Sequence, residues 1–167
     1  MSSSNKEEEE EEEETLRATI QSTITQFLNG PSEALRAGDP SLMLTMVTPE
    51  CSHNLRPLRF FTAYPFLKTT KTNADQEEMM ASVLPTMEST QNEVRDVVID
   101  VANRRASVLS EHTTKIVGAE KSSTLEIAWF LDFTEDGKMI GKVVEFIDTA
   151  TAAERIENMK KQGFGKE

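Results

Sequence analysis

Apolar residues recur every three or four positions near the beginning of the chain: Leu16, Ile20, Ile24, Phe27 and Leu28. This spacing places them on one face of a helix, which is predicted to begin near Thr15. The Gly-Pro pair at 30–31 is expected to end that helix, because proline lacks the backbone N–H that a continuing helix needs. A short second helix over 32–37 follows, and a third helical segment begins after Asp39, with proline at its first position.

The pattern changes twice in the rest of the chain. Residues 50–70 are irregular and aromatic, which predicts a short strand and then an apolar loop, and a helix with a capping box begins at Thr72. Beyond residue 92 the apolar period becomes two, the period of β-strands. Strand-like runs cover 94–101, 104–117, 124–134 and 138–148, and a helix over 151–161 follows. Because helices precede consecutive strands, the sequence predicts an α+β fold rather than alternating β-α-β units.

Charge separates a tail from a single domain. The 167 residues carry a net charge of −11, but eight of the acids form the run Glu7–Glu14, and without them 21 acids face 18 bases. A run of like charges buries nothing, so residues 1–14 are expected to be a disordered acidic tail. The single folded domain is expected over 15–162, with a frayed C-terminus over 163–167. No basic face is present to bind nucleic acid, and the tail would be repelled by anionic membranes.

Several classes of chemistry find no support in the sequence. The single cysteine, Cys51, excludes an internal disulfide, and no His, Cys or acidic spacing typical of a metal site is present. Neither G-x-G-x-x-G nor G-x-x-x-x-G-K-[ST] occurs, so no nucleotide cofactor is expected. No signal-peptide h-region and no apolar stretch of membrane-spanning length occur, so we expect a soluble cytoplasmic protein without cofactor or metal.

Two segments resemble a known family. The C-terminal segment STLEIAWFLDFTEDGKMIGKVVEFIDTATAAERI and the upstream segment AGDPSLMLTMVTPECSHNLRP resemble the SnoaL-like branch of the nuclear transport factor 2-like superfamily, and in particular small fungal isomerases and cyclases of secondary metabolism. The resemblance implies a cone-shaped, strongly bent antiparallel sheet with N-terminal helices closing a pocket. It also implies activity without a cofactor, although some relatives only bind or transport.

Glu145 is the first candidate for catalysis. Alternate residues of a strand share a face, so Val143, Glu145 and Ile147 point one way. A carboxyl on an apolar face that lines a dry pocket has a raised pKa and becomes a usable acid or base. The resemblance places an acid of limonene-epoxide hydrolase-like proteins at this position. The alternative is a glutamate in solvent or at a dimer interface, and Asp148, at the strand end, is expected to cap the next helix.

Two histidines and one arginine are further candidates. His112 shares a strand face with Thr114, where limonene-epoxide hydrolase-like proteins are expected to have an Arg and Asp pair. The departure disfavours epoxide hydrolysis and leaves an imidazole that could bind a substrate oxygen or carry a proton. His53 matches a histidine of the family, and Arg56 could clamp an enolate or carboxylate oxygen. Exposed positions for His112 and Arg56 remain the alternative.

Aromatic and branched side chains complete the expected substrate site. Phe61 and Tyr64 belong to an apolar lid, and Tyr64 adds one hydroxyl. Trp129, Ile127 and Ile147 are expected on the pocket wall, although an aromatic strand face is also typical of a plain core.

Three functions remain open after these observations. The first is a cofactor-independent isomerase, cyclase or dehydratase that uses acid/base chemistry on a small hydrophobic polycyclic polyketide, terpenoid or alkaloid intermediate. The second is a non-catalytic binding or dimerisation module of the same fold, and the third is an epoxide hydrolase. An enzyme should enclose Glu145 with a histidine or Tyr64 in a cavity of several hundred Å³. A homodimer is expected through the outer sheet face, which carries Ala128, Phe130, Val144 and Phe146.

Overall fold

The structure is a computed structural model that describes residues 3–166. Its helices are α1 (Ser3–Ala37), α2 (Leu58–Phe61), α3 (Asn73–Val83) and α4 (Thr149–Lys161), with 3-10 turns at Pro40–Leu44 and Leu84–Thr86. Its strands are β1 (Val47–Arg56), β2 (Thr70–Lys71), β3 (Met87–Asp100), β4 (Arg105–Ile116), β5 (Ser123–Phe133) and β6 (Ile140–Ile147). The described helices include none long and apolar enough to cross a bilayer.

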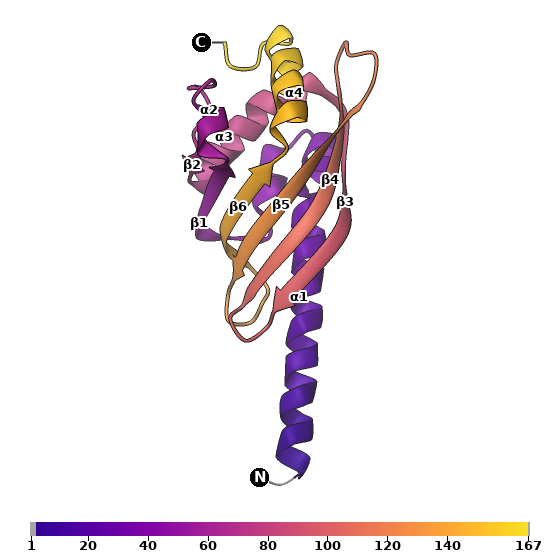
Figure 1. Cartoon of the computed structure of the whole chain (residues 1–167), viewed down its shortest axis with the longest axis vertical. Coiled ribbons are helices and arrows are strands. Elements are labelled where there is room, and N and C mark those ends of the chain that lie inside the picture. The colour runs from indigo at the N-terminus through magenta and orange to yellow at the C-terminus, as the bar shows by residue number, and fades with distance from the viewer. Residues whose placement is uncertain (1–2, 167) are drawn as a thin grey trace.

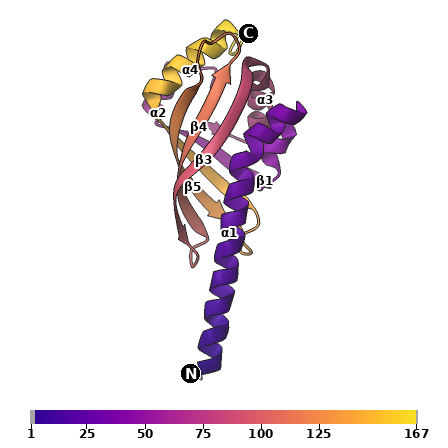
Figure 2. The same cartoon turned by 90° about the vertical axis from the view of Figure 1, so that its right-hand side faces the viewer.

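One six-stranded sheet organises the molecule, in the order β2-β1-β6-β5-β4-β3. Strands β3 to β6 form the expected antiparallel meander. Strand β1, however, runs parallel to β6, so the sheet is mixed and not wholly antiparallel as expected. Since the chain reaches β6 from β1 only after four intervening strands, the connection is long enough for a parallel pair. The α+β class and the arrangement of a bent sheet with helices over one face are confirmed (Figures 1 and 2).

Helix α1 is a single helix where the sequence predicts a break. It continues through the Gly-Pro pair at 30–31 as far as Ala37. Packing accounts for this: Gly30 is buried, and a Cβ atom there would lie only 3.4 Å from the Cα atom of Met43. Tertiary contacts on this turn therefore offset the hydrogen bond that Pro31 removes.

The two ends of the chain also differ from expectation. Residues 3–14, expected as a disordered tail, form the first turns of α1, and this part of the helix projects away from the sheet (Figures 1 and 2). An exposed pair between Lys6 and Glu10, with the charged atoms 3.7 Å apart, spans one turn there. At the other end Phe164, expected to fray, is buried and packs edge-on against Phe66 with ring centroids 5.4 Å apart.

Capping residues fix two helices that line the site. Thr72 and Asp75 form the expected capping box of α3, since the Thr72 side chain accepts from the Asp75 N–H and the Asp75 carboxylate accepts from the Thr72 N–H. Asp148 caps α4 as expected, accepting from the Ala150 N–H at 3.0 Å. Helix α4 therefore begins directly after β6 and is held across one end of the sheet (Figure 1).

Candidate active site

A cavity of about 190 Å³ lies between the inner face of the sheet and the helices that cover it. Every strand and all four helices contribute lining residues, and most of these are apolar. Five methionines are among them: Met43, Met79, Met80, Met87 and Met159. The cavity is smaller than the several hundred Å³ expected from the sequence. Because unbranched methionine side chains change rotamer easily, this wall can move aside for a larger ligand.

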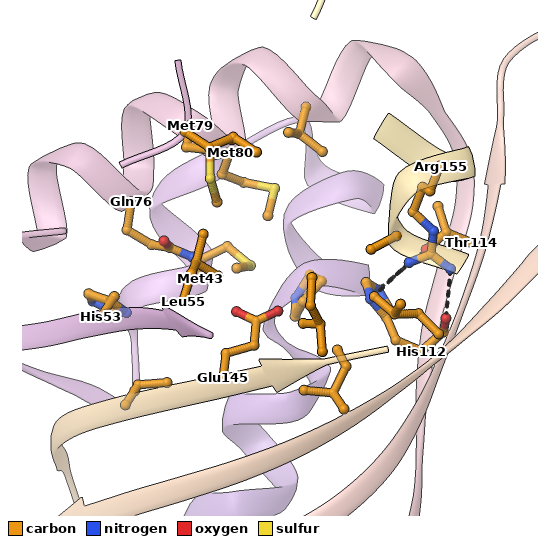
Figure 3. A pocket seen from close by; sticks show the side chains of 18 of the residues that line it. Met43, His53, Leu55, Gln76, Met79, Met80, His112, Thr114, Glu145 and Arg155 are labelled. Carbon is orange, nitrogen blue, oxygen red and sulfur yellow. Dashed lines mark hydrogen bonds between the residues drawn. The ribbon is translucent and has the colours of Figure 1, made fainter. Parts of the chain in front are cut away.

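Glu145 points into the cavity from the second half of β6 (Figure 3). The residue is half-buried, and its cavity-lining side chain lies among apolar neighbours such as Val143 and Ile147, as the strand pattern predicts. Burial raises the pKa of the Glu145 carboxyl, and the charges of Lys71 and Arg155 oppose that rise. No ion pair joins Glu145 to a base within the described residues 3–166. The site therefore holds an acid with a raised pKa and without a salt-bridge partner.

His53 lines the same cavity from β1 and is 5 % exposed. Its Nε2 atom lies 2.8 Å from Asn73 Oδ1, and Asn73 Nδ2 donates to the backbone carbonyls of Thr48 and Pro49. Because the amide N–H groups are thus engaged, Oδ1 accepts from His53 Nε2, and Nδ1 keeps the lone pair. Burial lowers the pKa of His53, the Asn73 hydrogen bond raises it, and Lys71 lowers it. His53 is therefore a neutral imidazole with one basic nitrogen.

His112 also lines the cavity, but its contacts hold it in one state. Arg155 Nη1 donates toward His112 Nδ1 at 3.4 Å, so the ring proton is on Nε2, which lies 2.6 Å from Thr90 Oγ1 (Figure 3 shows the Arg155 contact). Burial and then the Arg155 charge lower the pKa of His112 to about 3. The geometry is therefore that of a neutral ring that orients Arg155. The sequence had suggested a bond to a substrate oxygen or a proton carrier, with an exposed strand position as the alternative.

Lys71 and Arg155 are site residues that the sequence analysis missed. Arg155 is buried, donating from Nη2 to the carbonyls of His112 and Ser123 at 2.9 and 2.8 Å and from Nε to Ser123 Oγ at 3.1 Å. Burial lowers its pKa to about 10, and Glu145 raises it. A sequence signal did exist, since Arg155 lies on the buried stripe of α4 with Ala152, Ile156 and Met159. Lys71 had none, because β2 has only two residues and its flanks are polar.

Of the six other residues predicted for the site, four line the cavity and two do not. Phe61, Ile127, Trp129 and Ile147 line the cavity, and Trp129 Nε1 donates to Ser110 Oγ at 2.9 Å. Arg56 and Tyr64 are not among the lining residues. Arg56 Nη1 donates to the neighbouring Leu55 carbonyl at 2.7 Å, so the expected clamp is turned back onto its own strand. Tyr64 packs against the rings of Phe60 and Phe66, which places it in the lid and outside the cavity wall.

Other reactive groups do not add to the site. Cys51 is buried, and burial, with a smaller effect of Glu50, raises the pKa of its thiol to about 12. The thiol is therefore protonated at neutral pH and is not a nucleophile. Within the described part of the chain, no three His, Cys, Asp or Glu side chains are grouped in a way that could hold a metal ion.

Comparison with solved structures identifies the fold. A pinacolase, BvnE of Penicillium brevicompactum, superposes with a TM-score of 0.74 and 15% identity, over 88% of this chain and 98% of that one. PrhC of Penicillium brasilianum gives 0.72 and 15%, over 90% and 94%. An NTF2-like protein of Burkholderia pseudomallei gives 0.59 and 18%, over 84% and 97%. The chain has the nuclear transport factor 2-like fold. At these identities the likeness shows the NTF2-like fold alone.

Comparison of sequences matches a smaller part of this chain than the comparison of structures does. Monooxygenase AacuO of Aspergillus aculeatus is 31% identical over 80 residues. The match spans 48% of this chain and 49% of that protein, which is about half of each. No protein-family profile matches the chain.

Proposed function

We propose that the protein is a cofactor-independent enzyme that isomerises, cyclises or dehydrates a small apolar, polycyclic natural-product intermediate by moving protons. The observation that carries the proposal is the pairing in one apolar cavity of Glu145, whose pKa is raised, with His53, whose Nδ1 has a free lone pair. General acid/base catalysis needs an acid that is protonated and a base that is neutral over the same pH range, and burial favours both of these forms.

The two groups lie on neighbouring strands and face the same space. Glu145 is aligned with Leu55 across the parallel pair of β6 and β1, and His53 is two residues from Leu55, on the same face of the sheet. A bound substrate would therefore contact both groups at once. In a keto–enol isomerisation the protonated Glu145 carboxyl gives its proton to the carbonyl oxygen, and His53 Nδ1 takes a proton from the adjacent carbon.

The enol formed in this way can follow two routes. In a conjugated dienol, return of the His53 proton to a different carbon, with the O–H proton going back to Glu145, gives an isomer. Attack of the enol carbon on an electrophilic atom of the same molecule gives a ring, with the O–H proton going back to Glu145 and the His53 proton going to the electrophilic group. Arg155 stands on the far side of Glu145 from His53 (Figure 3), and its charge stabilises the carboxylate left when Glu145 has given its proton. The apolar wall excludes water, which would otherwise take up the transferred protons.

The likeness to fungal proteins, among them a pinacolase, supports a substrate from secondary metabolism. A binding module of the same fold predicts a cavity filled by side chains, and a space of about 190 Å³ lined by two histidines and a carboxyl argues for the enzyme. The strand of His112 carries neither the Arg nor the Asp expected for epoxide hydrolysis. The arginine that contacts His112, Arg155, comes from α4 and is held by backbone carbonyls, so the expected pair is not reproduced.

Proton abstraction can be measured without knowledge of the natural substrate. We expect the protein to catalyse exchange of the α-protons of 2-tetralone, a small bicyclic ketone, for deuterium in D₂O, followed by NMR. Glu145→Gln keeps the shape of the side chain but cannot transfer a proton, so the exchange rate should fall by at least about 100-fold.

The matched control is Glu126→Gln, because Glu126 is exposed on the outer face of the adjacent strand β5. This variant should exchange protons at the wild-type rate. A folded Glu145→Gln protein with wild-type exchange would contradict the assignment of Glu145.

A further inference from the structure

Lys71 is a buried cation for which the described residues supply no anionic partner. It lies opposite His53 in the β1–β2 pair, lines the cavity and is only 3% exposed. Within residues 3–166 its Nζ atom has one polar contact, with the sulfur of Met79 at 3.7 Å, and a thioether is a weak acceptor. The two carboxylates that act on its pKa are Glu145 and Asp75, and neither forms an ion pair with it in residues 3–166.

The other contacts of Asp75 explain why it forms no ion pair with Lys71. Asp75 is paired with Lys68, and its other oxygen accepts from Thr72 in the capping box of α3. Arg155, the second buried cation of the cavity, is in contrast held by two backbone carbonyls and by Ser123. The cavity thus contains two cationic side chains and one carboxyl, and a positive charge is left over even when Glu145 is ionised.

A second polar group that lines the cavity also has an unpaired atom. Gln76 lies one turn before Met79 on the same face of α3, lines the cavity and is 8% exposed. Its Oε1 atom is buried and accepts no hydrogen bond from the described part of the chain. Buried polar atoms are normally paired, and an unpaired buried ammonium is among the most costly groups in a protein. Both side chains therefore have bonding capacity that a ligand in the cavity could use.

We propose that Lys71 is the anchor of a carboxylate-binding subsite, so that the ligand of this cavity is an apolar ring compound that carries a carboxylate. The ammonium group would pair with the carboxylate, and Gln76 Oε1 would accept from a hydroxyl or N–H group next to it. The assignment rests on the proposed function only in naming the substrate class for the same cavity.

The position of Lys71 also orients such a ligand. A surface groove lined by Phe66, Lys68 and Asp75 shares four residues with the cavity: Leu67, Lys71, Met79 and Phe164. These four residues line both spaces, so Lys71 lies between the cavity and the groove. A carboxylate held there leaves the rings of the ligand to extend inward, past the methionines and toward Glu145.

The test compares two probes of the same shape. Isothermal titration calorimetry of the full-length protein should show that 2-naphthoate, an anion, binds at least about tenfold more tightly than the neutral 2-naphthamide. Lys71→Met replaces the ammonium by an apolar group of similar length, and it should abolish this preference while the affinity for 2-naphthamide stays the same. Lys71→Arg keeps the charge and should retain the preference.

Controls separate a binding role from a structural one. Lys142→Met makes the same change at an exposed position of β6 and should leave both affinities at the wild-type value. Removing an unpaired buried charge should raise the melting temperature of Lys71→Met, whereas loss of a structural contact would lower it. Equal binding of the two probes to the wild type, no binding of 2-naphthoate, or an undiminished preference in Lys71→Met would each overturn the proposal.

The two proposals fail separately. Binding of 2-naphthoate involves no proton transfer, so Glu145→Gln should still prefer the anion. Loss of deuterium exchange in that variant with an intact preference would support both proposals. Exchange that proceeds normally in a wild type without any preference for the anion would overturn the carboxylate subsite and leave the acid/base function standing.

Discussion

At the residue scale, burial acts on the ionisable groups of the cavity in the direction that makes each of them neutral. It raises the pKa of Glu145 and lowers the pKa of His53, His112 and Lys71. Desolvation penalises whichever form is charged, so acids and bases move in opposite directions. A cavity of this kind can donate a proton and accept one at the same pH, which two groups in water with ordinary pKa values do poorly.

The pH dependence of deuterium exchange follows from these two shifts. The active form has Glu145 protonated and His53 neutral, so exchange should fall as the pH rises through the raised pKa of Glu145. It should also fall as the pH drops through the lowered pKa of His53. We expect a bell-shaped profile, measured by NMR. A rate that rises continuously with pH would assign the role of base to ionised Glu145.

His112 makes a separate prediction about stability. Its pKa is about 3 in the folded protein and near 6.5 when unfolded, so its contribution to stability is fully present above pH 6.5 and is lost as the pH falls toward 3. Between pH 7 and pH 5 this loss amounts to about 2 kcal/mol of unfolding free energy. His112→Asn should therefore lose less stability over that interval than the wild type, measured by thermal melting.

A comparison with His53→Asn distinguishes the two histidines. Both have a lowered pKa, and only that of His112 reaches about 3, so removing His53 should reduce the acid sensitivity by a smaller amount. Equal acid sensitivity in His112→Asn and the wild type would show that His112 takes up a proton in the folded state.

Some residues of the cavity could be predicted from a local sequence pattern, and others could not. Glu145 interrupts an apolar strand face, and that local irregularity needs no knowledge of the fold. Lys71 lies among polar residues and becomes a site residue only because β2 pairs with β1 and brings it beside His53. Arg56 is the reverse case, a residue that the sequence suggested for the site and that the structure leaves out of the cavity wall. Its residue type suggested a ligand clamp, but its side chain donates to the adjacent Leu55 carbonyl.

At the scale of elements, the site depends on α4, which carries Arg155 across the end of the sheet. The helix is fixed at its start by Asp148, whose carboxylate accepts from the Ala150 N–H and from the Thr151 hydroxyl. Its buried face contains both Arg155 and apolar residues, so the same packing holds the helix and directs the charge. Local capping was readable from sequence, whereas the parallel position of β1 depended on long-range pairing that no local pattern reports.

Loss of the α4 cap should reduce stability by a modest amount. Asp148→Ala removes the side-chain acceptor and should lower the unfolding free energy by about 1 kcal/mol, measured by urea denaturation. Asp148→Asn still caps and should cost less. A stability loss as large for Asn as for Ala would mean that the negative charge, and not the hydrogen bond, is what matters.

The acidic turns of α1 should be dispensable. Residues 5–14 are exposed throughout, and the contacts of α1 with the core begin at Leu16. Deletion of residues 1–14 should leave both the melting temperature and deuterium exchange unchanged, because residues 5–14 contribute no buried surface. A clear drop in either quantity would show that the projecting helix docks onto another surface.

At the scale of the whole molecule, the sheet is apolar on both faces. Its inner face lines the cavity, while its outer face exposes Val98, Leu109, Phe130 and Phe146. Phe130 is aligned with Val144, and Ala128 with Phe146, so the outer residues of β5 and β6 form one continuous surface. The described helices cover the inner face and leave this surface open, and such a surface is typical of a contact with another chain.

The charges around this surface favour a second copy of the same chain, as the sequence already suggested. At one end Arg105 and Lys142 flank Asp132, and at the other Glu111 is aligned with Glu126. A two-fold axis through the apolar centre would place the basic end of one copy against the acidic end of the other. We therefore predict a homodimer, with a dimer mass by light scattering at micromolar concentration.

Phe130→Ser combined with Phe146→Ser should give a monomer that keeps its deuterium exchange, since neither side chain lines the cavity. Leu58→Ser, an equally exposed apolar position on α2, should remain dimeric. A monomer mass for the wild type would rule out this use of the outer face.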